Sequence, residues 1–243
     1  MATMKTLAIL PTYNEAKNID AILCKLLDFS FLNVLVVDDN STDKTKEIVS
    51  SFFDTGRVHM LERPSKLGLG TAYIKGFQWG LQREYELFFE MDADNSHNPA
   101  AVPYFIKKVG EGCDMVVGSR YINNTISVVG WDFKRLLLSK FGNWYASTLL
   151  RLTQFTDLTS GYRCYTKRAL ELIELEGIRS NGYAFQIEMV YKMHKAGLKI
   201  AEIPIIFYER NSGSSKMSKK IVKEAVLLPF KLTIDEIKKG LGF

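Results

Sequence analysis

Residues 87–97 read LFFEMDADNSH, an apolar run that ends in a cluster of acidic and other polar side chains. The run Leu87–Met91 is short and mostly apolar, which is typical of a strand covered on both faces of its sheet. Asp92 and Asp94 follow it directly and flank a single small residue. Both carboxylates can reach one hard cation, because such cations prefer oxygen ligands. An Asx turn before a helix that begins at Pro99 would give the same pattern, so both interpretations stay open at this point.

Strand and helix patterns alternate around this run over the first 120 residues. Further strands are predicted at Thr6–Leu10, Val34–Val37, Val58–Leu61 and Met115–Val117. Amphipathic helices are predicted at Ile19–Phe29, Thr42–Phe53, Gly70–Leu81 and Ala100–Val109. This alternation predicts an α/β fold with a mostly parallel sheet flanked by helices, in which ligands bind at the carboxyl ends of the strands.

The pattern after Arg120 is less regular. The predicted elements are helices at Lys134–Leu152, Lys167–Leu175 and Tyr183–Ala196, a further segment at 157–166, a strand-like stretch at Lys199–Tyr208 and a flexible polar loop at 209–218. A final amphipathic helix begins at Ile221 and is expected to bend or break at Pro229. No internal repeat or linker divides the chain. We therefore predict one domain over residues 1–218, followed by a basic helical segment over residues 219–243.

The positive charge of the chain is concentrated near its C-terminus. The 243 residues carry 32 Lys and Arg against 27 Asp and Glu, a net charge of +5, and the residues from 210 onward contain eight basic and three acidic side chains. With 47% hydrophobic and 24% charged residues, the composition is that of a globular domain and not of a disordered chain. The three cysteines are far apart, which favours a reducing compartment over a disulfide framework or a zinc site. No run approaches the ~18 apolar residues of a membrane span, so we expect a soluble, cytoplasmic chain.

Polar residues cluster at the ends of four predicted strands. The clusters are Pro11–Glu15, Asp38–Ser41, Asp92–His97 and Gly118–Arg120. Because the carboxyl ends of parallel strands meet at one edge of a sheet, these clusters should converge around one ligand.

Other acidic and nucleotide-binding motifs fit the sequence poorly. A calcium-binding EF-hand loop that began at Asp92 would need glycine where His97 stands. A receiver domain carries its acidic pair after the first strand, whereas Asp38 and Asp39 follow the second. No P-loop is present, and Gly68-Leu69-Gly70 lacks the dinucleotide fingerprint, although it could bring main-chain N–H groups near an anion or simply form a tight turn.

Several motifs, taken together and in this order, resemble the signature of family-2 inverting glycosyltransferases of the GT-A fold. They are Pro11–Glu15, Val36–Thr45, Lys66–Gly70, Asp92–Asp94 and Gly118–Tyr121. Later motifs resemble the branch of dolichol-phosphate (polyprenyl-phosphate) mannose synthases, namely Trp131–Ser139, Asp157–Arg163 and Arg210–Lys216. The resemblance implies a GT-A-type, Rossmann-like catalytic domain over residues 1–218, with C-terminal amphipathic helices beyond it.

The resemblance also implies a role for individual residues. The nucleotide sugar would be bound by Pro11, Tyr13, Glu15, Val37, Asp39, Asp92, Ala93, Asp94, Ser96, Arg120, Arg210 and Lys216. Mg²⁺ or Mn²⁺ would be bound by Asp92 and Asp94. The acceptor phosphate would be held by Arg120, Arg135, Ser139 and Arg210, because arginine can donate two parallel hydrogen bonds to phosphate oxygens. The catalytic groups would then be Asp92, Asp94, Arg120, Arg135 and Arg210, while Asp157 and Arg163 would either shape the site or form an ion pair with each other.

The implied reaction is metal-dependent transfer of mannose from GDP-mannose to a polyprenyl (dolichyl-type) phosphate, with inversion. The chain has three histidines and no obvious general base. None is needed, because a phosphate monoester with a second pKa near ~6 is already anionic at neutral pH. Catalysis then depends on positioning and on charge stabilisation. Two alternatives are a polyprenyl-phosphate glucosyltransferase that uses UDP-glucose and a catalytically silent subunit that binds a nucleotide sugar.

The C-terminal segment has an apolar face formed by Ile221, Ala225, Leu228 and Leu232, with lysines around it. One interpretation is a helix that lies on an anionic membrane, where each lysine near the surface contributes up to ~1 kcal/mol. The other is a helix packed on the domain with its lysines in solvent. In the first case the protein would be peripheral at the cytosolic face of a membrane, held there by this helix or by a membrane-spanning partner. Nucleic acid is not expected as a partner, because the segment has few aromatic residues and no binding motif.

Overall fold

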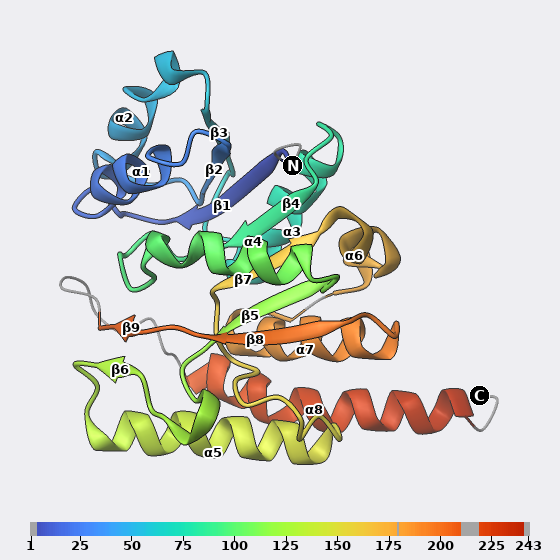
Figure 1. The fold of residues 1–243 in the computed structure, drawn as a ribbon. Coiled ribbons are helices and arrows are strands. Elements are labelled where there is room, and N and C mark those ends of the chain that lie inside the picture. Colours follow the sequence, from blue (N-terminus) through green and yellow to red (C-terminus); the bar gives the residue numbers. More distant parts are fainter. Residues whose placement is uncertain (1–3, 179, 210–218, 241–243) are drawn as a thin grey trace.

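The computed structural model describes residues 4–178, 180–209 and 219–240, which form a seven-stranded sheet with helices on both faces (Figure 1). The strand order is β3-β2-β1-β4-β7-β5-β8. The strands are β1 (Thr6–Thr12), β2 (Leu32–Asp38), β3 (Val58–Glu62), β4 (Leu87–Glu90), β5 (Met115–Ser119), β7 (Arg163–Thr166) and β8 (Ile200–Pro204). Neighbouring strands are parallel except where β7 pairs with β4 and β5. The predicted, mostly parallel sheet is therefore confirmed.

The helices form two layers, each with its own apolar core against the sheet. One layer contains α1 (Ile19–Leu27), α2 (Thr45–Ser50) and α4 (Val102–Gly110). The other contains α3 (Leu69–Leu81), α6 (Lys167–Leu172) and α7 (Gly182–Lys195). Short 3₁₀ turns lie at η1 (Phe53–Thr55), η2 (Pro99–Ala101), η3 (Ile122–Asn124) and η4 (Leu175–Gly177). The apolar faces of the two helix layers thus cover both sides of the sheet, which explains why its strands are mostly apolar.

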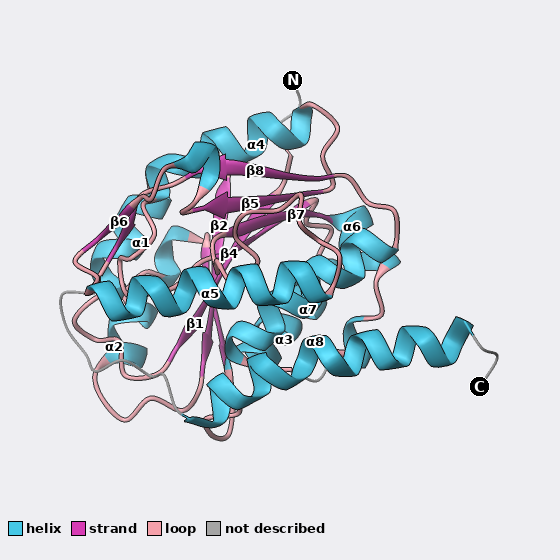
Figure 2. Cartoon of the chain, turned by 90° about the horizontal axis from the view of Figure 1, so that it is seen from below, coloured by secondary structure: helices cyan, strands magenta, loops and turns pink. Residues whose placement is uncertain are grey.

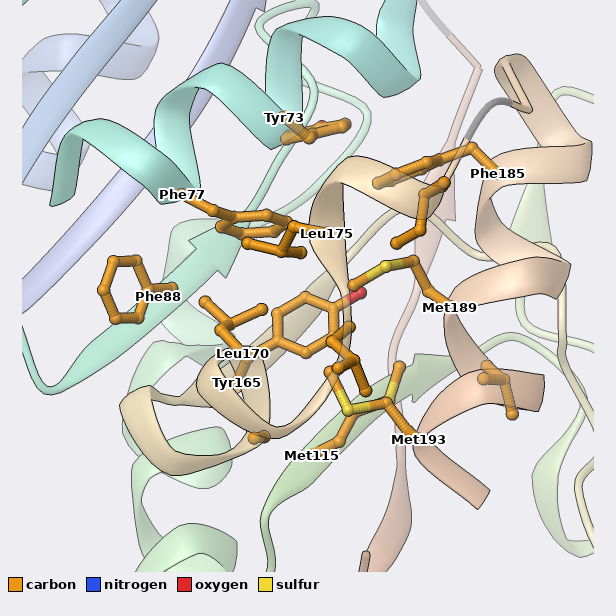
Figure 3. Close-up of a cluster of buried hydrophobic side chains, with 14 of the residues drawn as sticks. Tyr73, Phe77, Phe88, Met115, Tyr165, Leu170, Leu175, Phe185, Met189 and Met193 are labelled. Carbon is orange, nitrogen blue, oxygen red and sulfur yellow. The ribbon is translucent and has the colours of Figure 1, made fainter. Parts of the chain in front are cut away.

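An aromatic and methionine cluster fixes α3 and α7 to the sheet (Figure 3). Phe77 of α3 meets Tyr165 of β7 edge to face, with ring centroids 5.4 Å apart. Tyr73 stacks on Phe185 of α7 at 6.0 Å. Burying each such side chain contributes roughly 1.5–3 kcal/mol relative to leaving it exposed. The position of α7, whose first turn borders the site described below, is therefore set by the core.

Because β7 is antiparallel, the segment before it lies at the carboxyl edge of the sheet. Its first residue, Arg163, pairs with Glu90, the last residue of β4. The segment that leads into β7 therefore lies beside the acidic pair that follows β4. A second sheet of two short strands, β6 (Val128–Val129) and β9 (Phe207–Tyr208), adds to this edge through a bridge between Phe207 and His97.

α5 (Phe133–Leu149) and α8 (Lys219–Gly240) lie side by side along the lower side of the molecule in Figure 1 and in front of the sheet in Figure 2. Of the two outcomes expected at Pro229, the break does not occur, because α8 is continuous from Lys219 to Gly240. Two hydroxyl groups add hydrogen bonds to carbonyls near the proline: that of Tyr145 donates to the carbonyl of Val226 at 2.8 Å, and that of Thr233 donates to that of Pro229 at 2.9 Å. Within the described residues, no helix has the length and apolar character needed to cross a membrane.

We expect Gly80→Ala to destabilise the protein, although alanine favours helices over glycine by about 1 kcal/mol. A Cβ at Gly80 of α3 would lie 2.5 Å from Phe88 and 2.7 Å from Leu7, and overpacking of this kind costs about 1–3 kcal/mol. Gly142→Ala in α5 is the matched control, because nothing lies within 4 Å of its Cβ position. Urea unfolding measures both variants. A Gly80→Ala protein as stable as Gly142→Ala would contradict the packing of α3.

Candidate functional site

A cleft of about 650 Å³ opens at the carboxyl edge of the sheet. It is bordered by the ends of β1, β4 and β5, the loop before α3, the segment before β7, and the first turns of α5 and α7. Among the residues proposed from the sequence, those that line it are Pro11, Glu15, Asp92, Ala93, Asp94, Arg120 and Arg135. The structure thus brings some residues from each of the three expected sets, for the metal, the donor and the acceptor, to one cavity.

The acidic pair lies on a turn that His97 supports from behind. The main-chain N–H of Asp92 donates to Nδ1 of His97 at 3.1 Å, and the N–H of Ser96 donates to the Asp94 carboxylate at 3.0 Å. His97 is buried and stacks on Tyr162. Burial is the main reason that the pKa of His97 falls to about 4, so the ring is neutral and its Nδ1 can accept a hydrogen bond. The side chains of His97 and Asp94 therefore fix the conformation of the turn.

The donor set at this turn fits one type of metal site. Asp92 and Asp94 offer carboxylate oxygens to the cleft, the ligands that Mg²⁺ and Mn²⁺ prefer. Over the described part of the chain, no three His, Cys, Asp or Glu side chains are grouped to enclose a metal ion. Two carboxylates suit a cation that completes its shell with water and substrate phosphates, and they do not suit structural zinc.

A buried ion pair holds the loop before α3 at the edge of the cleft. Arg63 pairs with Asp39 and also donates to the carbonyl of Gly68 at 3.0 Å. Gly68 has φ +107°, and a Cβ there would lie 2.5 Å from the side chain of Asn181, so only glycine allows this approach to α7. Asp39 therefore acts on the cleft through the loop it anchors. Arg63 was missed by the sequence analysis, since no motif marks it.

Tyr13 lies beside the same loop, where the ammonium group of Lys66 sits 4.3 Å from the centroid of its ring. Lys66 itself lines the cleft. The side chain of Val37 is fully buried in the hydrophobic core rather than in the cleft. Ser96 is buried too, and its hydroxyl makes no hydrogen bond to the residues described. Arg210 and Lys216 lie outside the described residues.

Arg120 enters the cleft from the end of β5 with its charge already compensated. Its Nε and one terminal nitrogen each donate to the Asp157 carboxylate at 2.7 Å, and the pair is almost fully buried. Burial alone would raise the pKa of Asp157, but the charge and hydrogen bonds of Arg120 outweigh it and hold this pKa below its usual range. Glu202 of β8 in turn accepts hydrogen bonds from the main-chain N–H groups of Thr156 and Asp157. The orientation of Arg120 is therefore determined by two successive carboxylates.

Of the two roles left open for Asp157 and Arg163, the ion pair between them does not form, because Asp157 pairs with Arg120. Arg163 is fully buried and donates instead to the carbonyls of Leu158, Ser160 and Gln186, each at 2.7 Å. Those carbonyls belong to the segment before β7 and to α7, which both border the cleft. Arg163 is thus a structural clamp on the cleft wall.

Arg135 stands in the first turn of α5, where Asp132 caps the helix by accepting from the Arg135 N–H at 2.7 Å. Its guanidinium lies 4.3 Å from the centroid of the Trp131 ring, and that of Arg120 lies 5.3 Å from the same ring. Trp131 therefore holds both arginines of the proposed acceptor site at the end of the cleft. Arg135 also pairs with Glu209 at 2.7 Å.

An apolar groove of about 360 Å³ continues from this end of the cleft between α5, α7 and α8. It shares Arg120, Trp131, Arg135, Thr159 and Tyr183 with the cleft. Beyond them it is lined mainly by Leu138, Phe141, Gly142, Tyr145, Ile187, Ala225 and Val226. Ser139 lies in this groove and accepts a hydrogen bond from the Tyr121 hydroxyl at 2.7 Å. A charged site and an apolar channel are therefore joined at two arginines.

Four further polar residues line the cleft that the sequence did not single out. They are Asn181, Tyr183 and Gln186 at the start of α7, and Glu224 of α8, which accepts from the Asn181 N–H at 2.8 Å. The only local signal in the sequence for these residues is a polar residue, Asn181, just before the helix predicted at Tyr183–Ala196. That signal does not indicate which face of the helix lies against the cleft.

We expect Asp157→Asn to destabilise the protein by about 3–5 kcal/mol at neutral pH, because it leaves the buried Arg120 without its counter-charge. The folded-state pKa of Asp157 is depressed, so its stabilisation is present above the unfolded pKa of ~3.9 and is lost as the pH falls through the folded pKa. Urea unfolding from pH 7 to pH 3 should show the gap between wild type and variant closing at the acidic end. Glu111→Gln, which removes an exposed ion pair with Lys108, should change stability little at any pH. A gap that stays constant with pH would contradict this account.

The chain is similar to known proteins in both sequence and fold. The chain matches the family described as Glycosyl transferase family 2 over residues 7–173. It is 41% identical over 227 residues to a polyprenol monophosphomannose synthase of Mycolicibacterium smegmatis, covering 92% of this chain and 85% of that protein. It is 42% identical over 226 residues to an undecaprenyl-phosphate mannosyltransferase of Micrococcus luteus, covering 92% of each.

Among solved structures, glucosyl-3-phosphoglycerate synthase of Mycobacterium tuberculosis, in complex with Mn²⁺, UDP-glucose and phosphoglyceric acid, superposes with a TM-score of 0.69. The identity is 17%, over 93% of this chain and 79% of that one, so this likeness concerns the fold and confirms the predicted GT-A type. Together with the family match over more than half of its length, the sequence identity to two mannosyltransferases establishes that the chain belongs to glycosyl transferase family 2.

Proposed function

We propose that the protein transfers mannose from GDP-mannose to a polyprenyl (dolichyl-type) phosphate, with inversion, at the cytosolic face of a membrane. One observation carries this proposal: the polar cleft with its acidic pair opens, at Arg120 and Arg135, into an apolar groove. A phosphate at the junction would have a hydrophobic path for an attached chain. The relatives named above act on lipid acceptors of this kind, which supports the same substrate class here.

The donor would lie at the β1 and β4 side of the cleft, between Glu15 and the acidic pair. Asp92 and Asp94 would hold Mg²⁺ or Mn²⁺, which when bound supplies positive charge to the departing diphosphate. The residues of this chain do the rest of the positioning. His97 fixes the turn that carries Asp92, and the loop anchored by Asp39 and Arg63 borders the nucleotide end.

The acceptor phosphate would meet the guanidinium groups at the junction and needs no base. A phosphate monoester is largely dianionic at pH 7, so its oxygen can attack the sugar without losing a proton. His97 is the histidine that lines the cleft, and its Nδ1 is engaged by the Asp92 N–H. Orientation by Arg120 and Arg135 and exclusion of water by Trp131 and Phe207 are therefore the contributions we assign to the chain.

The membrane would contact α5 and α8, both of which turn apolar side chains to solvent. On α5 these are Phe133, Leu137, Leu138, Phe141 and Trp144, each between 46% and 70% exposed, and on α8 they are Val226, Leu227, Phe230 and Ile234. Exposed lysines accompany them at Lys134, Lys140, Lys223 and Lys231. The opposite side of α8 packs on the domain through Leu228 and Leu232. Both interpretations of the C-terminal helix can thus hold together, one for each side.

The transfer itself is tested with labelled GDP-mannose, Mg²⁺ and undecaprenyl phosphate, with labelled lipid extracted as product. Asp94→Ala should lower turnover at least about 100-fold, because charge stabilisation by a metal is worth several kcal/mol. Asp54→Ala, an exposed aspartate in η1, serves as the control and should retain activity. UDP-glucose and other nucleotide sugars are assayed in parallel. Transfer from UDP-glucose alone would mean that UDP-glucose, and not GDP-mannose, is the sugar donor. No transfer from any nucleotide sugar would mean that the protein is a catalytically silent binding subunit.

Vesicle sedimentation tests the membrane surface. Phe133→Ser combined with Trp144→Ser should weaken binding to vesicles containing anionic lipid at least about tenfold, since burying such a side chain contributes roughly 1.5–3 kcal/mol. Neither residue lines the groove. Tyr104→Ser is the control, because Tyr104 is 64% exposed on α4, which lies apart from α5 and α8 in both views (Figures 1 and 2). Equal binding by both variants would exclude the outer face of α5.

A further inference from the structure

Arg135 already has an anionic partner, although the proposed function assigns it to the lipid phosphate. One of its terminal nitrogens lies 2.7 Å from a carboxylate oxygen of Glu209. Its guanidinium rests on Trp131, so this ion pair forms at the end of the cleft and groove that the arginine lines. Glu209 lines neither cavity. A side chain from outside the site therefore holds the group that the acceptor phosphate would need.

The two ion pairs at the junction differ in their burial. In the pair of Arg120 and Asp157, the side chains are 5% and 0% exposed, whereas in the pair of Arg135 and Glu209 they are 24% and 41% exposed. Breaking the first would leave a buried charge uncompensated, while breaking the second returns two groups to water. The first pair is thus permanent and the second is exchangeable.

Glu209 can also leave without moving the backbone. Its main-chain N–H donates to the carbonyl of Val129 at 2.9 Å, which anchors this residue beside β6. A Cβ at Gly130 would lie 2.8 Å from the Cβ of Glu209, so glycine leaves the space that the side chain occupies. Rotation of the partly exposed Glu209 side chain about its own bonds is enough to free Arg135.

We propose that Glu209 is a specificity-determining residue that competes with anionic ligands for Arg135 and restricts this arginine to phosphate monoesters. A carboxylate carries one negative charge, whereas a phosphate monoester carries about 1.5 to 2 at pH 7 and has three acceptor oxygens. A monoester can therefore displace Glu209, but a diester, with a single charge, has no such advantage.

The selectivity has a purpose at a membrane surface. The headgroups of common anionic phospholipids are phosphate diesters, and they would outnumber a polyprenyl monophosphate around α5 and α8. With Asp157 and Glu209 in place, the charges of the two arginines are balanced, so the vacant junction does not attract diesters. This inference rests on the proposed function, because it takes Arg135 as the acceptor residue.

The test compares Glu209→Gln with wild type, using geranyl phosphate as the monoester and dibutyl phosphate as the diester. Both are measured as inhibitors of transfer to undecaprenyl phosphate in detergent. Glu209→Gln should lower the inhibition constant of the diester about two- to fivefold, the range expected for an exposed ion pair, and that of the monoester less. The KM for undecaprenyl phosphate should fall or stay constant while kcat is retained. Glu111→Gln, which removes the exposed pair with Lys108 on the far side of the sheet, is the matched control.

Two results would overturn the proposal. One is an unchanged ratio of the two inhibition constants in Glu209→Gln relative to Glu111→Gln. The other is a higher KM for undecaprenyl phosphate, which would mean that Glu209 helps to orient Arg135 for the acceptor. Calorimetric binding of geranyl phosphate and dibutyl phosphate without donor gives the same comparison independently of turnover. If wild type transfers no sugar, the proposed function fails, whereas equal binding of the two phosphates by wild type removes the role of Glu209.

Discussion

The carboxyl edge of the sheet depends on the hydrogen bonds that the buried guanidinium group of Arg163 donates. Arg163 is fully buried and is the first residue of the antiparallel strand β7, and its hydrogen bonds to three carbonyls join the segment before β7 to α7. A buried charge is tolerated only when its donors are satisfied, so these carbonyls have little freedom to move apart. Glu90 beside it shows the other side of this balance, since burial raises its pKa to about 7 even though Arg163 acts to lower it. Arg163 therefore ties together two elements that form the wall of the cleft.

The charged side chains in and around the cleft form pairs that differ in their position and burial. Asp39 and Asp157 are both committed to arginines and shape the site from behind. Asp92 and Asp94 face the cleft on a turn that His97 supports. At the other end of the cleft both arginines are paired with carboxylates, in a buried pair for Arg120 and a partly exposed pair for Arg135. Such preorganisation lets a site bind two phosphate-bearing substrates without large rearrangement.

α8 links this site to the surface that we assign to the membrane. Its first half reaches the cleft through Glu224, while Leu228 and Leu232 pack on the domain and Phe230 is exposed beyond them. α5 combines the same roles, because Arg135 in its first turn lines the cleft where the cleft meets the groove, and Trp144 further along is exposed to solvent. The two helices that would touch lipid are therefore the two that border the groove for a lipid chain.

The sequence by itself determined the strand and helix alternation, the mostly parallel sheet and the acidic turn after β4, because each depends on a local pattern of apolar and polar residues. Even there, side chains shifted boundaries: α2 begins at Thr45 rather than Thr42 because the Asp43 carboxylate binds the Thr45 N–H. Only the tertiary structure decided that β7 is antiparallel, that Arg120 pairs with Asp157, that α8 continues past Pro229, and that Glu209 lies against Arg135. Two of those pairings join residues that are 73 and 74 positions apart in the sequence, Glu90 with Arg163 and Arg135 with Glu209. No local pattern specifies such partners, since they are chosen by which elements pack side by side.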